Sequence, residues 1–336
     1  MDTPQGPGNE LVGVVCVDGA CFVGRVESVL AILCPGQGAQ APGMLSPWLE
    51  LPAVDASLEA FSEAAQVDLR QLGTQADAET IRDTQYAQPL IVAASLLSLQ
   101  ALLGEDTSAV DVTAGHSVGE LAAAAVAGTL SATDALTLVG VRGRAMAAAA
   151  SVTPTGMSAV VGGDPAEVDA ALTAHGLTAA NVNGGGQVVA AGTLEQLAAL
   201  ADAPPAKARV VPLQVAGAFH TEHMAPAVEQ VRAAAGAMTP IDPRATLLSN
   251  ADGAAVTSGP EALERLVAQV ARPVRWDLCC ETMLELGVTA VIELAPAGVL
   301  TGLARRTLPG VQTLALKSPD QIDAARELVR EHGGSR

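Results

Sequence analysis

The sequence has very few aromatic residues, because three Phe, two Trp and one Tyr make up only 2% of its 336 positions. Proteins that bind single-stranded nucleic acid stack bases on aromatic side chains, so the composition argues against this class. Basic residues are also scarce: 18 Lys and Arg stand against 36 Asp and Glu, which leaves a formal net charge of −18. Such a chain would repel a polyanion at long range. The composition therefore predicts no nucleic-acid partner.

Long apolar runs are missing as well, since no stretch reaches the roughly eighteen uninterrupted apolar residues of a membrane span. The amino terminus lacks the basic and apolar regions of a signal peptide, so we expect no membrane segment and a cytoplasmic location. Zinc-ligand spacing is absent among the cysteines, which predicts free thiols and no metal site. These cysteines are Cys16, Cys21, Cys34, Cys279 and Cys280.

Hydrophobic residues are abundant, at 49% of the chain, and they are mostly Ala, Val and Leu, so the protein can bury a large core. Strand patterns alternate with longer helical patterns over residues 29–153 and 215–336, which predicts one large α/β domain. Residues 1–28 open with Pro, Gly, Asn and Asp. We expect this first segment to be a poorly ordered extension or a loose hairpin.

Residues 154–214 have shorter units, which mark a second, smaller domain inserted into the first. The expected order is strand 157–161, helix 165–175, strands 178–182 and 187–191, helix 194–201 and strand 208–213. This βαββαβ order is typical of a ferredoxin-like domain. Near the end of the chain, the acidic helix 320–331 is expected to face solvent.

One stretch combines a strand, a sharp turn and a helix around a residue able to act as a nucleophile: Ala114-Gly115-His116-Ser117-Val118-Gly119-Glu120. The G-x-S-x-G pattern is typical of a nucleophile elbow. Gly115 and Gly119 remove side chains that would collide in so tight a turn, and free N–H groups follow Ser117. The same letters also fit a capping box, with Ser117 at the N-cap and Glu120 three residues later, and that reading needs no chemistry.

A catalytic serine needs a base, and His220 stands where a strand pattern gives way to a helix, which places it in a loop at a strand end. The alternative is a structural loop histidine. A metal site on His220 and His223 is disfavoured, because no third ligand completes it. The other histidines are weaker candidates: His116 adjoins the nucleophile, His175 ends a helix, and His332 is expected in a polar tail.

Three further groups can serve the same site. Arg142 falls between Leu138 and Met146 on an apolar helix flank, where an unpaired guanidinium costs several kcal/mol, so it needs an anionic partner. That partner is either a ligand or an internal carboxylate. The glycine-rich turn at 35–40 has no Lys, which disfavours a phosphate site and favours a backbone N–H beside Ser117. Gln269 ends a helix, where a free carbonyl could orient an imidazole.

These residues resemble those of the malonyl-CoA:acyl carrier protein transacylases, the FabD-type acyltransferases of fatty-acid and polyketide synthesis. The resemblance runs from about Val29 to about Lys317 and rests on six motifs in the family's order. The motifs are Pro35-Gly36-Gln37-Gly38-Ala39-Gln40, Gly115-His116-Ser117-Val118-Gly119-Glu120, Val141-Arg142-Gly143-Arg144, Asn181-Val182-Asn183 before Gln187-Val188, Gly217-Ala218-Phe219-His220, and Gln269-Val270-Ala271-Arg272-Pro273-Val274-Arg275-Trp276.

The resemblance implies an α/β-hydrolase-like large domain with an inserted ferredoxin-like small domain. It implies that Ser117 is acylated, that His220 is its base, and that Arg142 binds the malonyl carboxylate. The remaining roles follow the same resemblance: the oxyanion hole is formed by the backbone N–H groups of Gln37 and Val118, the Gln269 carbonyl orients His220, and Phe219, His116 and Asn183 line the pocket.

The implied reaction is ping-pong transfer from malonyl-CoA, through malonyl-serine, to the phosphopantetheine thiol of acyl carrier protein. No bound cofactor is implied, and a monomer is expected. The alternative is a serine hydrolase or thioesterase on the same elbow, which would have no use for Arg142. A third reading, a non-catalytic docking domain, would not need Ser117, His220 and Arg142 together. Because carrier proteins are acidic, docking is expected on a local basic patch of Arg272, Arg275, Arg305 and Arg306.

Overall fold

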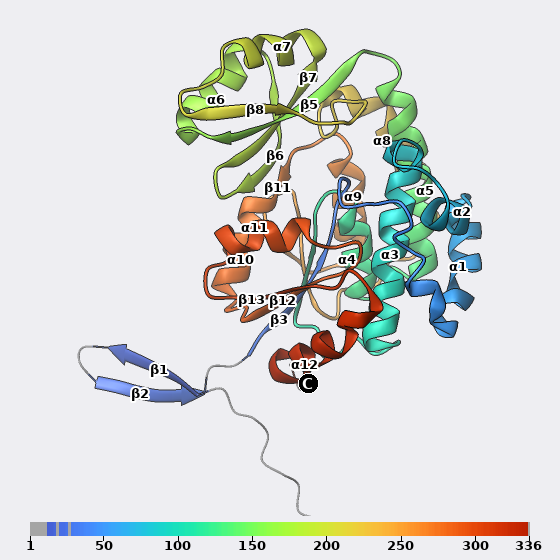
Figure 1. Ribbon diagram of the computed structural model, residues 1–336, viewed down its shortest axis with the longest axis vertical. Helices are drawn as coiled ribbons and strands as arrows, with labels where there is room; N and C mark the ends of the chain where they lie inside the picture. The colour runs from blue at the N-terminus through green and yellow to red at the C-terminus, as the bar shows by residue number, and fades with distance from the viewer. Residues whose placement is uncertain (1–11, 18–19, 26–27, 335–336) are drawn as a thin grey trace, which may run out of the picture.

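The strand that precedes the glycine-rich turn lies near the centre of a six-stranded sheet (Figure 1). A computed structural model describes residues 12–17, 20–25 and 28–334 of the chain. The order of the large sheet is β10-β9-β4-β3-β12-β13, and all neighbours are parallel except β10 and β9. Its strands are β3 (Leu30–Cys34), β4 (Val112–Gly115), β9 (Thr246–Leu248), β10 (Ala255–Val256), β12 (Ala290–Glu293) and β13 (Gln312–Ala315).

Helices cover both faces of this sheet, which is why β3 and β4 are buried along their whole length. Leu30 and Ile32 pack on the face with the helices α1 (Pro52–Ala65), α3 (Thr84–Leu103), α4 (Gly119–Val126) and α5 (Ala132–Ala150). Ala31 and Leu33 pack on the opposite face, against α10 (Trp276–Glu285) and α11 (Val299–Thr307). The remaining helices of this part are α2 (Leu69–Thr74), α8 (Ala225–Ala235), α9 (Gly259–Gln269) and α12 (Ile322–His332).

Helix α3 is the one helix in the described part of the chain that is long and apolar enough to cross a membrane. The protein buries 78% of its apolar stretch, largely against α5 and α1. Ser131 caps α5 by accepting a hydrogen bond from the Asp134 N–H, as an N-cap serine does. Among the polar side chains that these helices bury are Gln88 on α3 and Arg142 on α5.

A second sheet lies above the first in Figure 1, in the order β11-β6-β7-β5-β8. Four of its strands belong to six consecutive elements in a βαββαβ order: β5 (Thr155–Gly162), α6 (Pro165–Ala174), β6 (Thr178–Gly184), β7 (Gln187–Thr193), α7 (Leu194–Asp202) and β8 (Ala208–Pro212). The fifth strand, β11 (Val274–Arg275), comes from far along the chain and adds to β6 in parallel. This sheet therefore includes residues from outside 154–214.

At the amino terminus, β1 (Val12–Val17) pairs with β2 (Ala20–Arg25) as an antiparallel hairpin that extends away from both sheets (Figure 1). A loose hairpin was one of the two expectations for residues 1–28. The rest of that expectation, the order of residues 1–11, 18–19 and 26–27, lies outside the described residues, as do the thiols of Cys16 and Cys21. Cys34, Cys279 and Cys280 are buried free thiols.

The carboxyl-terminal helix differs from the expectation of a solvent-facing element. One face of α12 is buried through Ile322, Ala325 and Leu328, while its acidic residues occupy the other face. His332 is likewise not in an exposed tail, because it is only 2% exposed and its Nδ1 lies 2.8 Å from the Thr289 hydroxyl. The helix is therefore amphipathic: its many charged residues obscure, in the sequence, an apolar stripe at helical spacing that packs on the core.

Candidate active site

The elbow at Ser117 is formed between the end of β4 and the start of α4. Ser117 has a positive φ of 54°, which a non-glycine residue adopts only where the surroundings hold it there. A Cβ added at Gly119 would lie 2.1 Å from the Cys34 carbonyl oxygen, and one at Gly115 would lie 2.0 Å from the Gly119 carbonyl carbon. Both positions therefore require glycine, and the turn exposes the serine hydroxyl to a cavity.

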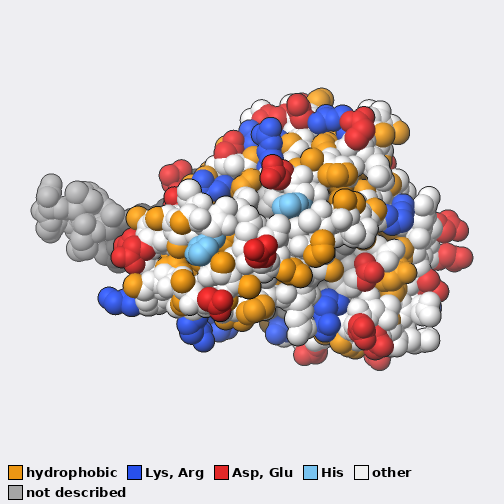
Figure 2. Space-filling model, turned by 90° about the horizontal axis from the view of Figure 1, so that it is seen from above, with side chains coloured by type: hydrophobic (Ala, Val, Ile, Leu, Met, Phe, Trp, Pro, Cys, Tyr) orange, Lys and Arg blue, Asp and Glu red, His pale blue; other side chains and the backbone are white. Residues whose placement is uncertain are grey.

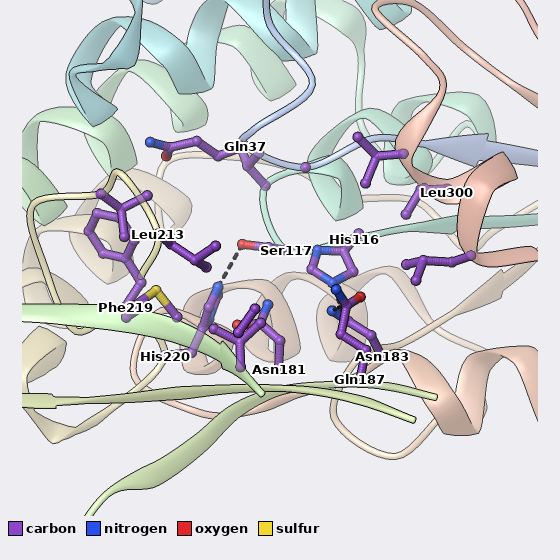
Figure 3. Close-up of a pocket in the computed structure, with 18 of the residues that line it drawn as sticks. Gln37, His116, Ser117, Asn181, Asn183, Gln187, Leu213, Phe219, His220 and Leu300 are labelled. Carbon is purple, nitrogen blue, oxygen red and sulfur yellow. Dashed lines mark hydrogen bonds between the residues drawn. The ribbon is translucent and has the colours of Figure 1, made fainter. Parts of the chain in front are cut away.

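The capping-box alternative is not formed. The N-cap of α4 is Val118, without a side-chain cap, and the Ser117 hydroxyl instead lies 2.6 Å from His220 Nε2 (Figure 3). The Glu120 carboxylate turns into the interior, where it accepts hydrogen bonds from the Asn250 N–H and from Gln269 Nε2. Asn250 in turn accepts from the Ser117 N–H at 2.8 Å and thereby fixes the backbone of the turn.

His220 lies in the loop after β8 and is 3% exposed. Its Nδ1 lies 2.9 Å from the carbonyl oxygen of Gln269, which can only accept, so Nδ1 carries the proton and Nε2 is free to accept from Ser117. Burial and the nearby Arg142 cation lower the pKa of His220 to about 3. The imidazole is therefore neutral at physiological pH, as a general base must be.

Two backbone N–H groups near Ser117 are candidates for an oxyanion hole. The Gln37 side chain is held by the Thr84 hydroxyl at 2.8 Å and the Arg82 carbonyl at 3.3 Å, which positions the turn after β3. Within the described residues, neither the Gln37 N–H nor the Val118 N–H donates to another protein group. Val118 precedes the first turn of α4, where N–H groups are free and the helix dipole favours a negative charge.

Arg142 is 3% exposed, and its guanidinium reaches the site from α5. Nη1 donates to the Gln88 side-chain oxygen, and Nη2 donates to Gln269 Oε1 at 2.7 Å and to the Ser117 hydroxyl at 3.4 Å. No carboxylate among the described residues lies within ion-pair distance of it, so the internal salt bridge is not formed. Burial lowers the pKa of Arg142 to about 10, which still leaves a cation at neutral pH.

The cavity beside these groups has a volume of about 470 Å³ and lies between the two sheets. Phe219, which is 7% exposed, lies beside His220 on one wall (Figure 3). Other apolar lining residues are Met146, Met157, Val189, Leu213, Leu300 and Leu303. Ser117, His220 and Arg142 all open onto this cavity, which can therefore present one substrate to all three groups.

His116 forms a separate part of the wall, and its ring hydrogen-bonds to Asn183 and not to the Ser117 hydroxyl. Its Nε2 lies 2.9 Å from Asn183 Oδ1, and Asn183 donates to Gln187 at 3.3 Å (Figure 3). Its ring stands 5.7 Å from that of Trp276, and burial lowers its pKa. His116 is therefore a neutral group that connects the elbow to the second sheet.

Some residues of the site are absent from the motif reading. Gln88, Asn250 and the side chain of Gln269 carry the hydrogen bonds around Arg142 and Ser117, although no local pattern marks Gln88 or Asn250. The only role that the sequence suggested for Glu120 was in a capping box at the start of α4. In the part of the chain that the structure describes, no three metal-ligating side chains gather.

The chain matches the family model described as an acyl transferase domain over residues 32–325. A curated malonyl CoA-acyl carrier protein transacylase of Mycobacterium tuberculosis (strain ATCC 25618 / H37Rv) is 53% identical over 306 residues, which covers 89% of this chain and 100% of the relative. The crystal structure of MCAT from Mycobacterium tuberculosis superimposes with a TM-score of 0.86 at 53% identity, covering 89% and 99% of the two chains.

A further solved structure shows a malonyl-transacylase in complex with a type II PKS acyl-carrier protein. It matches with a TM-score of 0.83 at 29% identity and covers 90% of this chain and 100% of that one. The 53% identity to the Mycobacterium tuberculosis relative over nearly its whole length, together with the Ser117–His220 pair, identifies the family of this chain. The chain belongs to the malonyl-CoA:acyl carrier protein transacylase family of acyltransferases.

Proposed function

We propose that this enzyme transfers the malonyl group of malonyl-CoA to the phosphopantetheine thiol of acyl carrier protein through a malonyl ester of Ser117. The observation that carries the proposal is Arg142: a buried cation without an ion-pair partner in the described structure, with Nη2 at 3.4 Å from the Ser117 hydroxyl. An acyl group that carries its own carboxylate supplies the missing anion while its thioester carbon meets Ser117.

In the first half-reaction, His220 Nε2 takes the proton of the Ser117 hydroxyl as Oγ attacks the thioester carbonyl. The oxyanion is stabilised by the N–H groups of Gln37 and Val118. The carbon–sulfur bond then breaks, and the protonated His220 gives its proton to the sulfur of the departing CoA. Throughout, the Gln269 carbonyl holds Nδ1–H and so stabilises the imidazolium.

In the second half-reaction, the phosphopantetheine thiol enters the same cavity and His220 removes its proton. The sulfur attacks the malonyl ester, the ester carbon–oxygen bond breaks, and the proton returns to Ser117.

Substrate binding also favours this chemistry electrostatically. Arg142 lowers the pKa of His220 in the empty site, and a bound carboxylate offsets that charge, so His220 becomes a stronger base once malonyl is present.

A hydrolase on the same elbow would pass the acyl group to water and would have no use for a cation that binds the acyl group. Intact-mass measurement after mixing with malonyl-CoA tests the proposal directly. We expect a malonyl adduct that persists until holo acyl carrier protein is added. Rapid loss of the adduct to water alone would instead indicate a hydrolase.

Replacing Arg142 with alanine is expected to lower kcat/KM for malonyl-CoA by about 100-fold or more, since losing one partner of a buried charge pair costs roughly 2–5 kcal/mol. Acetyl transfer should stay equal or improve, because acetyl has no carboxylate for the cation to bind. Steady-state transfer from both CoA esters to the carrier protein measures this. Equal losses for both acyl groups would show that Arg142 is only structural.

Phe219 is proposed to exclude branched acyl groups, since it closes the cavity wall beside His220. One extra methyl group changes the free energy of binding in a tight pocket by about 1–3 kcal/mol, so malonyl should be preferred over methylmalonyl by roughly 10- to 200-fold in kcat/KM. Phe219→Ser should relax that preference. Comparing kcat/KM for both esters in wild type and variant is the measurement, and a wild type without preference would contradict the assignment.

The domain arrangement is also part of the proposal: an α/β-hydrolase-like domain (29–153 and 215–336) with a ferredoxin-like insertion (154–214). The antiparallel neighbours β8-β5-β7-β6 support it. The enzyme is proposed to act as a cytoplasmic monomer without a bound cofactor, and the buried free thiols suit a reducing compartment.

Carrier-protein docking is proposed near Arg306, an exposed residue that lines the cavity, together with Arg305 and Arg272. Arg275 is a weaker contributor than the sequence indicates, because it is paired with Asp277 at 2.7 Å. On the face shown in Figure 2, basic side chains are interspersed with acidic ones. Any attraction for an acidic carrier is therefore local, and salt should weaken it.

A further inference from the structure

The side chain of Gln269 lies between a buried cation and a buried carboxylate. Its Oε1 accepts from Arg142 Nη2 at 2.7 Å, while its Nε2 donates to the Glu120 carboxylate and, at 2.9 Å, to the Ser117 carbonyl. Glu120 is 5% exposed and Gln269 is 6% exposed, so water cannot replace these contacts freely. The amide therefore has one orientation that satisfies both neighbours.

The two oxygens of Glu120 face only donors. Oε1 accepts from the Asn250 N–H, and Oε2 accepts from Gln269 Nε2. An ionised carboxylate accepts strongly at both oxygens, whereas a protonated acid is a weak acceptor at its hydroxyl oxygen and an amide must turn its NH2 toward one of these N–H groups. The ionised form of this residue is thus the one that fits the contacts on both sides.

The backbone of Gln269 has a different role and different supports. Its carbonyl accepts from His220 Nδ1 and from the Arg272 N–H at 3.2 Å, and it is placed by the end of helix α9. The position of this carbonyl does not depend on the side chain. A change at Glu120 should accordingly disturb Arg142 while leaving in place the carbonyl that orients His220.

We propose that Glu120 is a positioning residue: its ionised carboxylate fixes the Gln269 amide, which in turn holds Arg142 in the orientation that binds an acyl group's carboxylate. This inference rests on the proposed function, because it assumes that Arg142 binds malonyl. Glu120 does not touch the substrate in this scheme. Glu120 instead affects the selectivity for acyl groups that carry a carboxylate, and it does so through its contact with the Gln269 side chain.

The charged and titratable groups around Glu120 come from three helices. Arg142 on α5 and Arg265 on α9 favour its ionised form, and Cys279 on α10 is a neutral thiol whose pKa is raised well above the usual value by burial. Arg265 is itself paired with Asp252 at 2.7 Å and with Glu261 at 2.9 Å. Burial outweighs these attractions and raises the pKa of Glu120 to about 7.

The main test compares Glu120→Gln with wild type for two acylating reagents, malonyl-CoA and the neutral ester p-nitrophenyl acetate. The variant should raise KM for malonyl-CoA on the order of tenfold or more, because misplaced binding groups carry penalties of this size. Acylation by the neutral ester should change less than about threefold, since it needs Ser117 and His220 but not Arg142. Glu264→Gln, an exposed acid on α9 outside the network, is the matched control and should match wild type for both reagents.

A double-variant cycle tests the route through the amide. Gln269→Ala keeps the backbone carbonyl and should reproduce the selective loss of malonyl binding. Adding Glu120→Gln to it should cause no further loss. Additive losses, or equal losses for malonyl-CoA and the neutral ester, would overturn the proposal. Thermal melts check folding, and if Glu120→Gln does not fold, Gln269→Ala alone must show the selective loss or the proposal fails.

The wild-type enzyme offers a test without substitution. Acidification through pH 7 protonates Glu120 and should raise KM for malonyl-CoA, while the neutral-ester rate stays level. A KM that falls on acidification would show that Glu120 acts only by its charge and would overturn the positioning role. If wild type forms no malonyl adduct at all, the proposed function fails as well; if it forms the adduct and Glu120→Gln keeps the malonyl preference, only this inference fails.

Discussion

Replacing Ser117 with alanine is expected to abolish the malonyl adduct and to lower transfer by about 10³-fold or more. The reason is that, among the residues the structure describes, Ser117 alone combines the strained turn, the 2.6 Å contact to His220 Nε2 and the neighbouring free N–H groups. Without the nucleophile, the remaining groups can only bind and polarise the thioester. Intact mass after mixing with malonyl-CoA, and transfer to holo carrier protein, are the two measurements.

Ser151→Ala is the matched control for this variant. Ser151 is exposed at the end of α5, and its hydroxyl donates only to the Ala148 carbonyl at 2.8 Å. We expect it to keep both the adduct and the transfer rate. A Ser117→Ala protein that retained transfer to within tenfold of wild type would place the chemistry elsewhere.

Replacing His220 with alanine is expected to lower acylation by about 10²- to 10⁴-fold, which is the usual contribution of a general base. The adduct should still form slowly, because Ser117 and the proposed oxyanion donors remain. Single-turnover acylation, followed by intact mass, measures the rate. His223→Ala is the control: it removes a histidine three residues away that does not contact Ser117, and it should leave the rate unchanged.

The pH dependence of the same step follows from the lowered pKa of His220. The neutral imidazole is the competent form, and a pKa of about 3 keeps it neutral far below the usual histidine value of 6.5. With a neutral ester, kcat/KM should therefore stay level as pH falls through 6.5, because this ratio reports the free enzyme. A loss of rate centred near pH 6.5 would show that burial does not lower this pKa.

Much of the secondary structure could be predicted because its signals are local. The helix predicted at 165–175 and the strands at 178–182 and 187–191 appear as α6, β6 and β7, which follow from helical periodicity and short apolar runs. Gly115 and Gly119 were recognised as steric requirements, and the short distances at their Cβ positions confirm this. The error at α12 arose because its charged residues, acidic and basic together, outnumber the three buried apolar residues Ile322, Ala325 and Leu328.

The candidate site was predictable only in part. Ser117, His220 and Arg142 lie in recognisable motifs, and the structure brings their side chains to one cavity. The partners of Arg142 could not be foreseen, since the helix pattern required an anion and the structure supplies two neutral amides, Gln88 and Gln269. The local sequence was equally compatible with Glu120 as part of a capping box at the start of α4.

The sequence by itself determined the tight turn of the elbow, because the collision that glycine avoids at Gly115 involves Gly119, only four positions away. The tertiary structure alone decided what surrounds it. Asn250 reaches the Ser117 N–H across 133 residues, and Gln269 reaches Glu120 across 149. Contacts of that range depend on how sheets and helices pack, and they leave no periodicity in the chain, so the orientation of Glu120 and the partners of Arg142 are properties of the folded protein.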